Sequence, residues 1–326
     1  MKRRSLILIA ICLFGITSAY AQAIKVTVLH LNDTHGCGTA NMTAQGDCLL
    51  SRAATIVKSI RKEVASEGGH VLLLHGGDAF FEDHSKTKGD VLRLNNGTAE
   101  VIAMHHLGYD AMVLGNHEFD ETPRLKLLKE MNAFPMLSAN VYDKGTTNHW
   151  ATPYIIKNAG KARIAIFGLS PGTDLKWNVM RGGKKYVSVT EVHEAAKTLV
   201  PKLRKEADLV IGLTHLGSKY DLGLAKYGVD LIVGGHFHEF LKEGIRREKT
   251  MVVQAGWRYM AVGRVDIELQ ARGEGKGYEV SSIKAQLIYT KTAKPDPEMG
   301  KFLIDLKERI EKKEDLTKWR PEQAKR

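Results

Sequence analysis

Aspartate, asparagine and histidine recur in five short clusters of this sequence. The clusters are Asp33-Thr34-His35, Gly77-Asp78, Gly115-Asn116-His117-Glu118, Thr214-His215 and Gly235-His236-Phe237-His238. Imidazole, carboxylate and amide groups together suit divalent zinc, manganese, iron or cobalt. The set has too many histidines for calcium, and no cysteine takes part. We therefore expect a site for divalent metal ions, with ligands drawn from distant parts of the chain.

Each cluster follows a short run of aliphatic and β-branched residues. The runs are 25–31, 71–74, 111–114, 209–213 and 231–233, and helical patterns cover 49–67, 98–107, 123–131 and 189–207. Runs this apolar are typical of strands covered on both faces. The alternation predicts an α/β domain with stacked sheet layers, followed by antiparallel strands at 251–254, 264–269 and 283–289. Open α/β sheets bind ligands beyond the carboxyl ends of their strands, where these clusters lie.

The composition is that of an ordinary globular protein. The chain has 326 residues and a formal net charge of +11, and 43% of it is hydrophobic. This excludes collagen, coiled-coil and multi-span membrane proteins, and the length allows one large α/β domain or two small ones. The basic residues are scattered and no nucleic-acid motif accompanies them, so we expect no nucleic-acid partner.

The N-terminus has the pattern of a secretory signal peptide. Lys2, Arg3 and Arg4 precede an apolar run over 6–16, and Ala19 and Ala21 form an A-x-A cleavage site. The run is much shorter than the ~20 residues that span a bilayer, so we expect no stable membrane anchor. These features predict cleavage after residue 21 and an exported protein, periplasmic or extracellular.

Export would place Cys37 and Cys48 in an oxidising compartment. A short segment rich in glycine, threonine and asparagine separates them. Disulfides persist in such compartments, so we predict a bridge between these two residues, with a pair of thiols as the alternative.

The segment Lys294-Pro295-Asp296-Pro297 is the clearest break in the chain. Apolar residues recur beyond it at helical spacing: Met299, Phe302, Leu303, Leu306 and Ile310. The pattern predicts one amphipathic helix followed by a basic polar tail. The helix either packs against its own domain or docks onto another protein.

Taken together and in order, the five clusters resemble the signature of the calcineurin-like metallophosphoesterases. Several segments resemble the 5′-nucleotidase branch of that family: 29–36, 115–120, 214–217, 229–238 and 253–256. The resemblance covers about residues 24–290. It implies a layered α/β/β/α sandwich. Together with the N-terminal and C-terminal patterns, it predicts a signal peptide at 1–21, one catalytic domain at 22–293 and an amphipathic helix with a basic tail at 294–326.

The resemblance also implies two metal ions. The first would be held by Asp33, His35, Asp78 and His238, and the second by Asp78, Asn116, His215 and His236. Asp78 would bridge them, because two cations about 3.5–4 Å apart need a shared anion to offset their repulsion. Many 5′-nucleotidases have glutamine where this chain has His238.

The implied reaction is hydrolysis of phosphate monoesters, with 5′-nucleotides as the leading candidates. A hydroxide shared by the two metals would attack phosphorus in line. His117 would be the general acid or electrostatic stabiliser for the leaving alkoxide, and Asp120 would hold its other ring nitrogen. Alternatives are hydrolysis of cyclic nucleotides, nucleotide sugars or another anionic ester, and a non-catalytic metal-dependent binding subunit.

Family members with defined nucleotide specificity use a second domain to bind the base and the phosphates, and the resemblance stops before it. Two hypotheses follow. A separate substrate-binding protein completes the site, docking on the helix over 299–310, or the domain works alone on small phosphorylated substrates with little base recognition.

Overall fold

The computed structural model describes residues 23–80, 97–131, 133–175, 177–273 and 275–321. The signal peptide predicted at 1–21 lies outside these residues and stays a prediction. Within the described residues, no helix is both long enough and apolar enough to cross a membrane.

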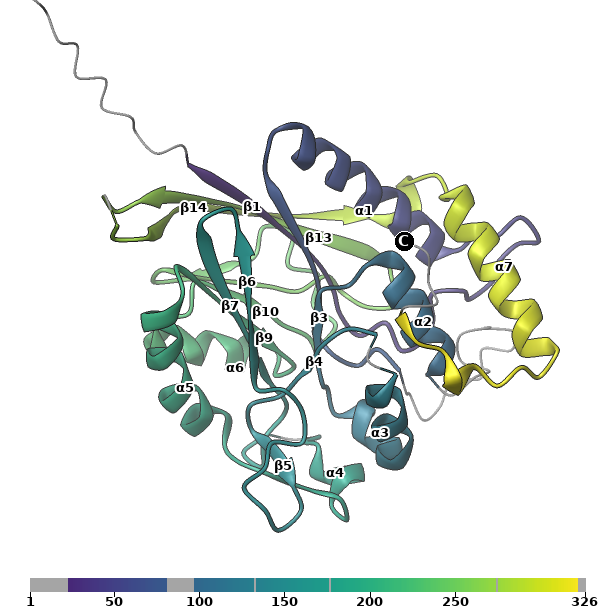
Figure 1. The fold of residues 1–326 in the computed structure, drawn as a ribbon, viewed down its shortest axis with the longest axis horizontal. Helices are drawn as coiled ribbons and strands as arrows, with labels where there is room; N and C mark the ends of the chain where they lie inside the picture. The colour runs from purple at the N-terminus through teal and green to yellow at the C-terminus, as the bar shows by residue number, and fades with distance from the viewer. Residues whose placement is uncertain (1–22, 81–96, 132, 176, 274, 322–326) are drawn as a thin grey trace, which may run out of the picture.

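Two six-stranded sheets form the centre of the molecule (Figure 1). The first has the order β14-β13-β1-β2-β3-β4. Its strands are β1 Ile24–Leu31, β2 His70–His75, β3 Ala111–Val113, β4 Met136–Leu137, β13 Ala261–Ala271 and β14 Tyr278–Tyr289. Strands β1 to β4 are parallel, and β13 and β14 extend the sheet in antiparallel fashion.

The second sheet has the order β11-β12-β10-β9-β7-β6. Its strands are β6 Tyr154–Ala159, β7 Ala162–Leu169, β9 Leu209–Thr214, β10 Leu231–Val233, β11 Ile245–Arg247 and β12 Thr250–Val253. The segment 251–254, predicted as an antiparallel strand, lies in β12 and pairs in parallel with β10. Its antiparallel neighbour is β11, a short edge strand that the hydrophobic pattern did not reveal. A small third sheet pairs β5 Val141–Asp143 with β8 Val187–Val189.

Helices cover the outer faces of both large sheets, and the chain's alternating apolar residues explain why. Along β1, Val26 and Val28 point into the core between the sheets, whereas Leu29 and Leu31 point into the core under the first helix layer. That layer contains α1 Leu49–Ser66, α2 Thr98–Leu107, α3 Thr122–Glu130 and α7 Pro297–Glu311. The second sheet is covered by α5 Val192–Glu206 and α6 Ser218–Asp221, on the opposite side in Figure 1. The predicted α/β/β/α sandwich is confirmed.

The predicted C-terminal helix is α7, and it packs on its own domain. Met299, Leu303 and Leu306 are buried in the core beneath α1 and α2. Asp296 caps the helix by accepting a hydrogen bond from the backbone N–H of Met299 (2.7 Å). Its apolar face is therefore covered by the chain's own core.

The structure differs from the disulfide prediction. Cys37 and Cys48, both among the described residues, are buried thiols without a bridge between them. The Cys37 thiol donates to the carbonyl of His35 (3.4 Å), and Cys48 lies at the N-cap of α1 with its sulfur 3.6 Å from the hydroxyl of Ser51. Each sulfur is directed to a local oxygen acceptor, which the spacing of two cysteines does not reveal.

Candidate metal centre

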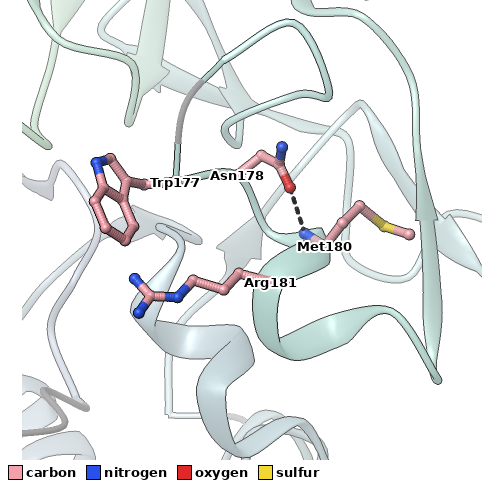
Figure 2. A pocket seen from close by; sticks show the side chains of 4 residues that line it. All are labelled: Trp177, Asn178, Met180 and Arg181. Carbon is pink, nitrogen blue, oxygen red and sulfur yellow. Dashed lines mark hydrogen bonds between the residues drawn. The ribbon is translucent and has the colours of Figure 1, made fainter.

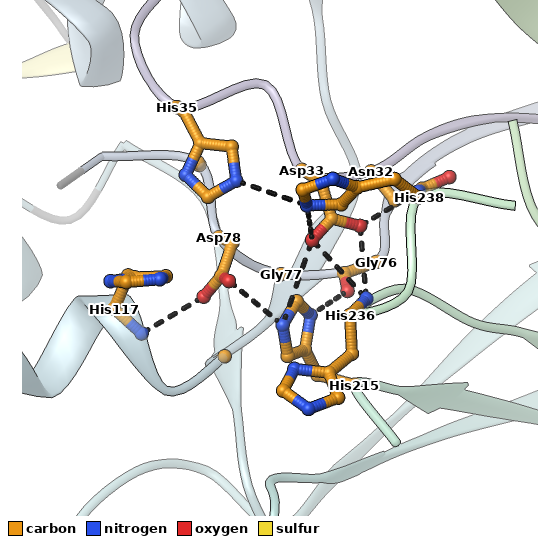
Figure 3. Close-up of polar contacts among 12 residues, drawn as sticks. Asn32, Asp33, His35, Gly76, Gly77, Asp78, His117, His215, His236 and His238 are labelled. Atoms are coloured by element: carbon orange, nitrogen blue, oxygen red, sulfur yellow. Dashed lines mark hydrogen bonds and ion pairs between the residues drawn. The ribbon is translucent and has the colours of Figure 1, made fainter. Parts of the chain in front are cut away.

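The polar clusters predicted from the sequence meet where the carboxyl ends of the two sheets face each other. The candidate ligands divide by strand: Asp33 and His35 follow β1, Asp78 follows β2, Asn116 follows β3, His215 follows β9, and His236 and His238 follow β10. Figure 3 shows six of these side chains converging from opposite sheets on one small region: Asp33, His35, Asp78, His215, His236 and His238. Placing ligands beyond strand ends is the arrangement expected for open α/β sheets.

Two groups of metal-type ligands stand side by side. Asp33, His35 and His238 form the first, and Asp78, His215 and His236 form the second; within each group the ligand atoms lie within 4.8 Å of one another. Asp33 touches both groups, because its Oδ1 is 3.3 Å from Nε2 of His238 and 3.8 Å from Nε2 of His215. The structure thus brings together six of the seven predicted ligands as two adjoining triads.

The donor atoms of these triads fit divalent cations. Nε2 of His35 and Nε2 of His238 face each other at 3.4 Å, a geometry in which a shared cation or proton removes the repulsion of two lone pairs. The seventh predicted ligand, Asn116, has its Oδ1 buried with no hydrogen-bond partner among the described residues. Buried polar oxygens normally have a partner, so this orphaned amide oxygen suits coordination.

The loops that carry the ligands are joined by backbone hydrogen bonds. The N–H of Asp33 donates to the carbonyl of Gly77 (2.9 Å), and the N–H of His35 donates to that of Asp78 (3.0 Å). Across the sheets, Nδ1 of His215 donates to the carbonyl of Gly76 (2.7 Å). That bond fixes the ring so that Nε2 points at Asp78, as outer hydrogen bonds commonly orient metal-binding histidines.

Several candidate ligands have a left-handed backbone, which is costly for residues other than glycine. The φ angles are 51° at Asp33, 49° at His35, 55° at Asp78, 85° at His236 and 56° at His238. Such conformations persist only where surrounding contacts impose them, and they concentrate at functional sites. Close approach adds a further demand at Gly115, where a Cβ would lie 2.2 Å from Oδ1 of Asp78.

Burial and charge tie the titration of these groups together. Burial opposes ionisation of Asp33 and Asp78, but the charge of His215, hydrogen bonds from His238 and His215, and the charge of His35 together outweigh it and lower the pKa of both carboxyls. Burial likewise opposes the charged form of His215, while the two carboxylates raise its pKa to about 10.

Burial and the charge of His215 lower the pKa of His236 to about 4, leaving it neutral and able to donate a lone pair. Two buried carboxylates at one point require compensating positive charge.

His117 and Asp120 lie together at the edge of the candidate centre, on the 3₁₀ helix η2 His117–Glu121. Nδ1 of His117 donates to Oδ2 of Asp120 at 2.6 Å, and the backbone N–H of His117 donates to Asp78 (3.0 Å). Burial lowers the pKa of His117, but the bond to Asp120 and the charge of Asp78 outweigh it and raise that pKa to about 9. The imidazole is therefore a proton donor at neutral pH, with Nε2 on the side away from Asp120.

Two residues that the motifs contain have roles that the sequence did not reveal. Glu118 is fully buried, and its carboxylate accepts hydrogen bonds from the backbone N–H groups of Asp78, Ala79, Phe80 and Gly115 at 2.7–3.1 Å. Burial and the charge of Asp78 raise its pKa to about 7. Asn32 donates to Oδ2 of Asp33 (2.7 Å) and to a backbone carbonyl. Glu118 and Asn32 stand close to predicted metal ligands in the sequence, and this closeness was the signal that could have pointed to their roles.

The profile of the calcineurin-like phosphoesterase family matches residues 26–240, which include all of the candidate ligands. The chain belongs to the calcineurin-like phosphoesterase family. The chain is 31% identical to a 5′-nucleotidase of Vibrio cholerae over 88% of this chain and 59% of that one. It is 34% identical to protein UshA of Escherichia coli, over 83% of this chain and 53% of that one. The resemblance inferred from the motifs is confirmed.

The fold of this family member is also found in solved structures. A calcineurin-like phosphoesterase, YfkN, from Bacillus subtilis superimposes with a TM-score of 0.67 at 22% identity, over 89% of this chain and 98% of that one. A 5′-nucleotidase precursor from Thermus thermophilus gives 0.66 at 23% identity, over 89% and 59%. The chain spans about half the length of the curated relatives that it matches.

Proposed function

We propose that this calcineurin-like phosphoesterase hydrolyses phosphate monoesters, with 5′-nucleotides as the leading substrates. The observation that carries the proposal is the position of the hydrogen-bonded pair His117 and Asp120 beside the two adjoining ligand triads. Metal-type ligands alone would serve a binding protein equally well. A charged imidazole held in place by a carboxylate is useful for proton transfer, and so favours catalysis.

The proposed centre uses the ligands predicted from the sequence. Asp33, His35, Asp78 and His238 would hold one divalent metal ion, and Asp78, Asn116, His215 and His236 would hold the other, as zinc, manganese, iron or cobalt. When bound, such ions supply positive charge for the phosphoryl oxygens and lower the pKa of water.

The chain's own residues provide the rest of the chemistry. Asp120 accepts the Nδ1 proton of His117, so the Nε2 proton of His117 can pass to the leaving oxygen of the ester. Asp78 accepts the backbone N–H of His117 and so holds η2 at the edge of the proposed centre. Glu118 holds the adjoining loops in place through its hydrogen bonds to four backbone N–H groups.

The proposal includes export of the protein and a separate substrate-binding protein as its partner. The signal-peptide pattern at 1–21 supports a periplasmic or extracellular protein. A separate substrate-binding protein that docks at α7 would have to use the polar face of the helix, because Met299, Leu303 and Leu306 are buried.

The test is a substrate panel with purified protein and manganese. The substrates are AMP, a 2′,3′-cyclic nucleotide, UDP-glucose and a bis-aryl phosphodiester, assayed for released phosphate or alcohol. We expect AMP to be hydrolysed fastest. We expect His117→Ala to lower kcat by about 10²- to 10⁴-fold while manganese binding is kept, because only proton transfer is lost.

The matched control is His193→Ala, a histidine on α5, away from the candidate centre. Unchanged turnover in His117→Ala would refute the proton-donor role. Preference for another panel member would replace AMP with that ester class, and no turnover of any substrate would refute hydrolysis by this chain acting alone.

A further inference from the structure

Trp257 stacks on the imidazole ring of His238, one of the candidate ligands. The two ring centres are 4.8 Å apart and the ring planes differ by only 12°, so the rings lie face to face. The contacts between candidate histidines are edge-on instead, at 75° between His35 and His238 and at 67° between His215 and His236. Parallel aromatic pairs attract one another beyond the area that they bury. The indole therefore covers and restrains one face of the His238 ring.

The ring of His238 is held differently from that of His215. Nδ1 of His215 donates to the carbonyl of Gly76 (2.7 Å), and the side chain is fully buried. Nδ1 of His238 has no hydrogen bond to any residue that the structure describes, and the side chain is 35% exposed. An outer hydrogen bond usually orients a metal-binding imidazole. The stacked indole supplies a restraint that no hydrogen bond at Nδ1 of His238 provides.

The loop after β12, which carries Trp257, is bonded to two loops that carry candidate ligands. Nδ2 of Asn32, in the loop after β1, donates to the carbonyl of Gly256 (2.6 Å). The N–H of Gly256 donates to the carbonyl of Glu239 (2.9 Å), the residue that follows His238. The residue before Trp257 is thus fixed on both sides, and the position of the indole relative to His238 is fixed with it.

Arg258 restrains the indole further. Its backbone N–H donates to the carbonyl of Asp33 (2.9 Å), and its guanidinium carbon lies 4.0 Å from the centre of the Trp257 ring. A cation over an indole is attracted by the negative face of the ring. Trp257 is half-buried, so these contacts limit the movement of a side chain that solvent would otherwise leave free. A restrained indole can set the plane of the His238 ring.

We infer that Trp257 is a positioning residue, whose indole holds the imidazole of His238 in the orientation needed to bind a metal ion. The inference rests on the proposed function, because that function includes the metal centre. A ligand that is already oriented loses less conformational freedom on binding. Without the indole, the partly exposed ring of His238 would turn more freely. The proposed ion held by Asp33, His35, Asp78 and His238 would then bind more weakly.

The test is a calorimetric titration of the purified protein with manganese. We expect Trp257→Ala to lower the affinity for one of two ions by about tenfold and to leave the affinity for the other within about twofold. Trp257→Phe, which keeps a ring that can stack, should bind manganese like the wild type. Trp257→Leu, which keeps apolar bulk without an aromatic face, should resemble Trp257→Ala. Equal affinities in all four proteins would overturn the inference, as would equal losses in Trp257→Phe and Trp257→Ala.

A double-mutant cycle separates stacking from general packing. His238→Gln retains an amide oxygen that can coordinate a metal ion, but it leaves no ring for the indole to hold. We therefore expect Trp257→Ala to weaken manganese binding in the wild-type background and to have little effect in the His238→Gln background. Equal losses in the two backgrounds would assign Trp257 a packing role only and overturn the inference.

The matched control is Trp177→Ala. Trp177 also lies against an arginine, with the guanidinium carbon of Arg181 4.3 Å from its ring centre. It belongs to the turn before α4 Met180–Gly183 rather than to the loop after β12 (Figure 2). Manganese affinity should be that of the wild type, and a loss as large as that of Trp257→Ala would overturn the inference.

The same titrations distinguish failure of the inference from failure of the proposed function. A wild type that binds manganese but does not hydrolyse AMP would refute hydrolysis by the chain acting alone, and the affinities of the Trp257 variants would still decide the inference. A wild type that binds no manganese would overturn the inference together with the proposed centre.

Discussion

Glu118 illustrates how one buried side chain can organise a metal centre without coordinating anything. Its carboxylate accepts hydrogen bonds from the loop after β2, through Asp78, Ala79 and Phe80, and from the loop after β3, through Gly115. The two loops carry candidate ligands that must lie side by side. Beyond the ends of β2 and β3 the backbones no longer pair with each other, and the hydrogen bonds to Glu118 join the two loops instead. The position of Asp78 therefore depends on Glu118.

Glu118→Gln should therefore weaken both folding and metal binding. The amide keeps the size of the side chain but turns an NH₂ group toward backbone N–H donors. We expect the free energy of unfolding to fall by about 2 kcal/mol in urea titrations, and manganese affinity to fall in calorimetry. Glu121→Gln, at an exposed position of the same short helix, is the control. Equal stability and affinity in the two variants would contradict the role of Glu118.

At the scale of the elements, α7 is a helix whose packing partner the sequence did not decide and that the structure places in the domain. Its amphipathic pattern allowed docking on its own domain or on another protein. The helix begins at a cap formed by Asp296, which also pairs with Lys58 of α1 at 2.7 Å. With Leu303 fully buried, the apolar face of α7 is a part of the first core rather than an open surface.

Leu303→Ala should therefore cost stability and leave the chemistry alone. Removing this buried side chain leaves a cavity, so we expect a loss of about 2–5 kcal/mol in the free energy of unfolding. Manganese affinity and AMP turnover, measured well below the melting temperature, should not change, because α7 lies on the outer layer. Lys301→Ala, on the exposed face, is the matched control. Wild-type stability in Leu303→Ala would show that the helix is not packed as described.

At the scale of the whole molecule, the candidate centre joins the two halves of the sandwich. The first sheet supplies Asp33, His35, Asp78 and Asn116, and the second supplies the remaining histidines. The apolar core between the sheets sets their distance, while left-handed backbone and buried like charges work against the site itself. Metal ions that bind only the folded chain would offset that cost.

Metal addition should consequently raise the melting temperature. At a hundredfold excess over Kd, each site contributes about 2.7 kcal/mol to the free energy of unfolding, or several degrees in Tm. Thermal unfolding is followed with increasing manganese and after treatment with EDTA. In Asp78→Asn, which weakens a charge shared by the proposed pair of sites, the rise should be largely lost. Identical melting with manganese and with EDTA would contradict a metal centre that bridges the sheets.

The sequence by itself determined the residue types of the candidate site and the fold class. Strand runs such as 25–31 and the polar residues after them are local features, and parallel strands place their ends at a common edge. From these, an α/β domain with stacked sheet layers and the clustering of Asp33, Asp78 and His215 could be predicted, and the family resemblance implied the α/β/β/α sandwich. Residue type and distance along the chain sufficed, because the seven ligands follow the ends of only five strands, β1, β2, β3, β9 and β10.

Only the tertiary structure decided the features that depend on contacts between distant segments. It paired β12 in parallel with β10, covered the apolar face of α7, and directed the thiols of Cys37 and Cys48 to local acceptors. It also set Glu118 across the loops after β2 and β3. The physical reason is the same in each case: packing and hydrogen bonding between remote segments select one arrangement among several that local sequence permits.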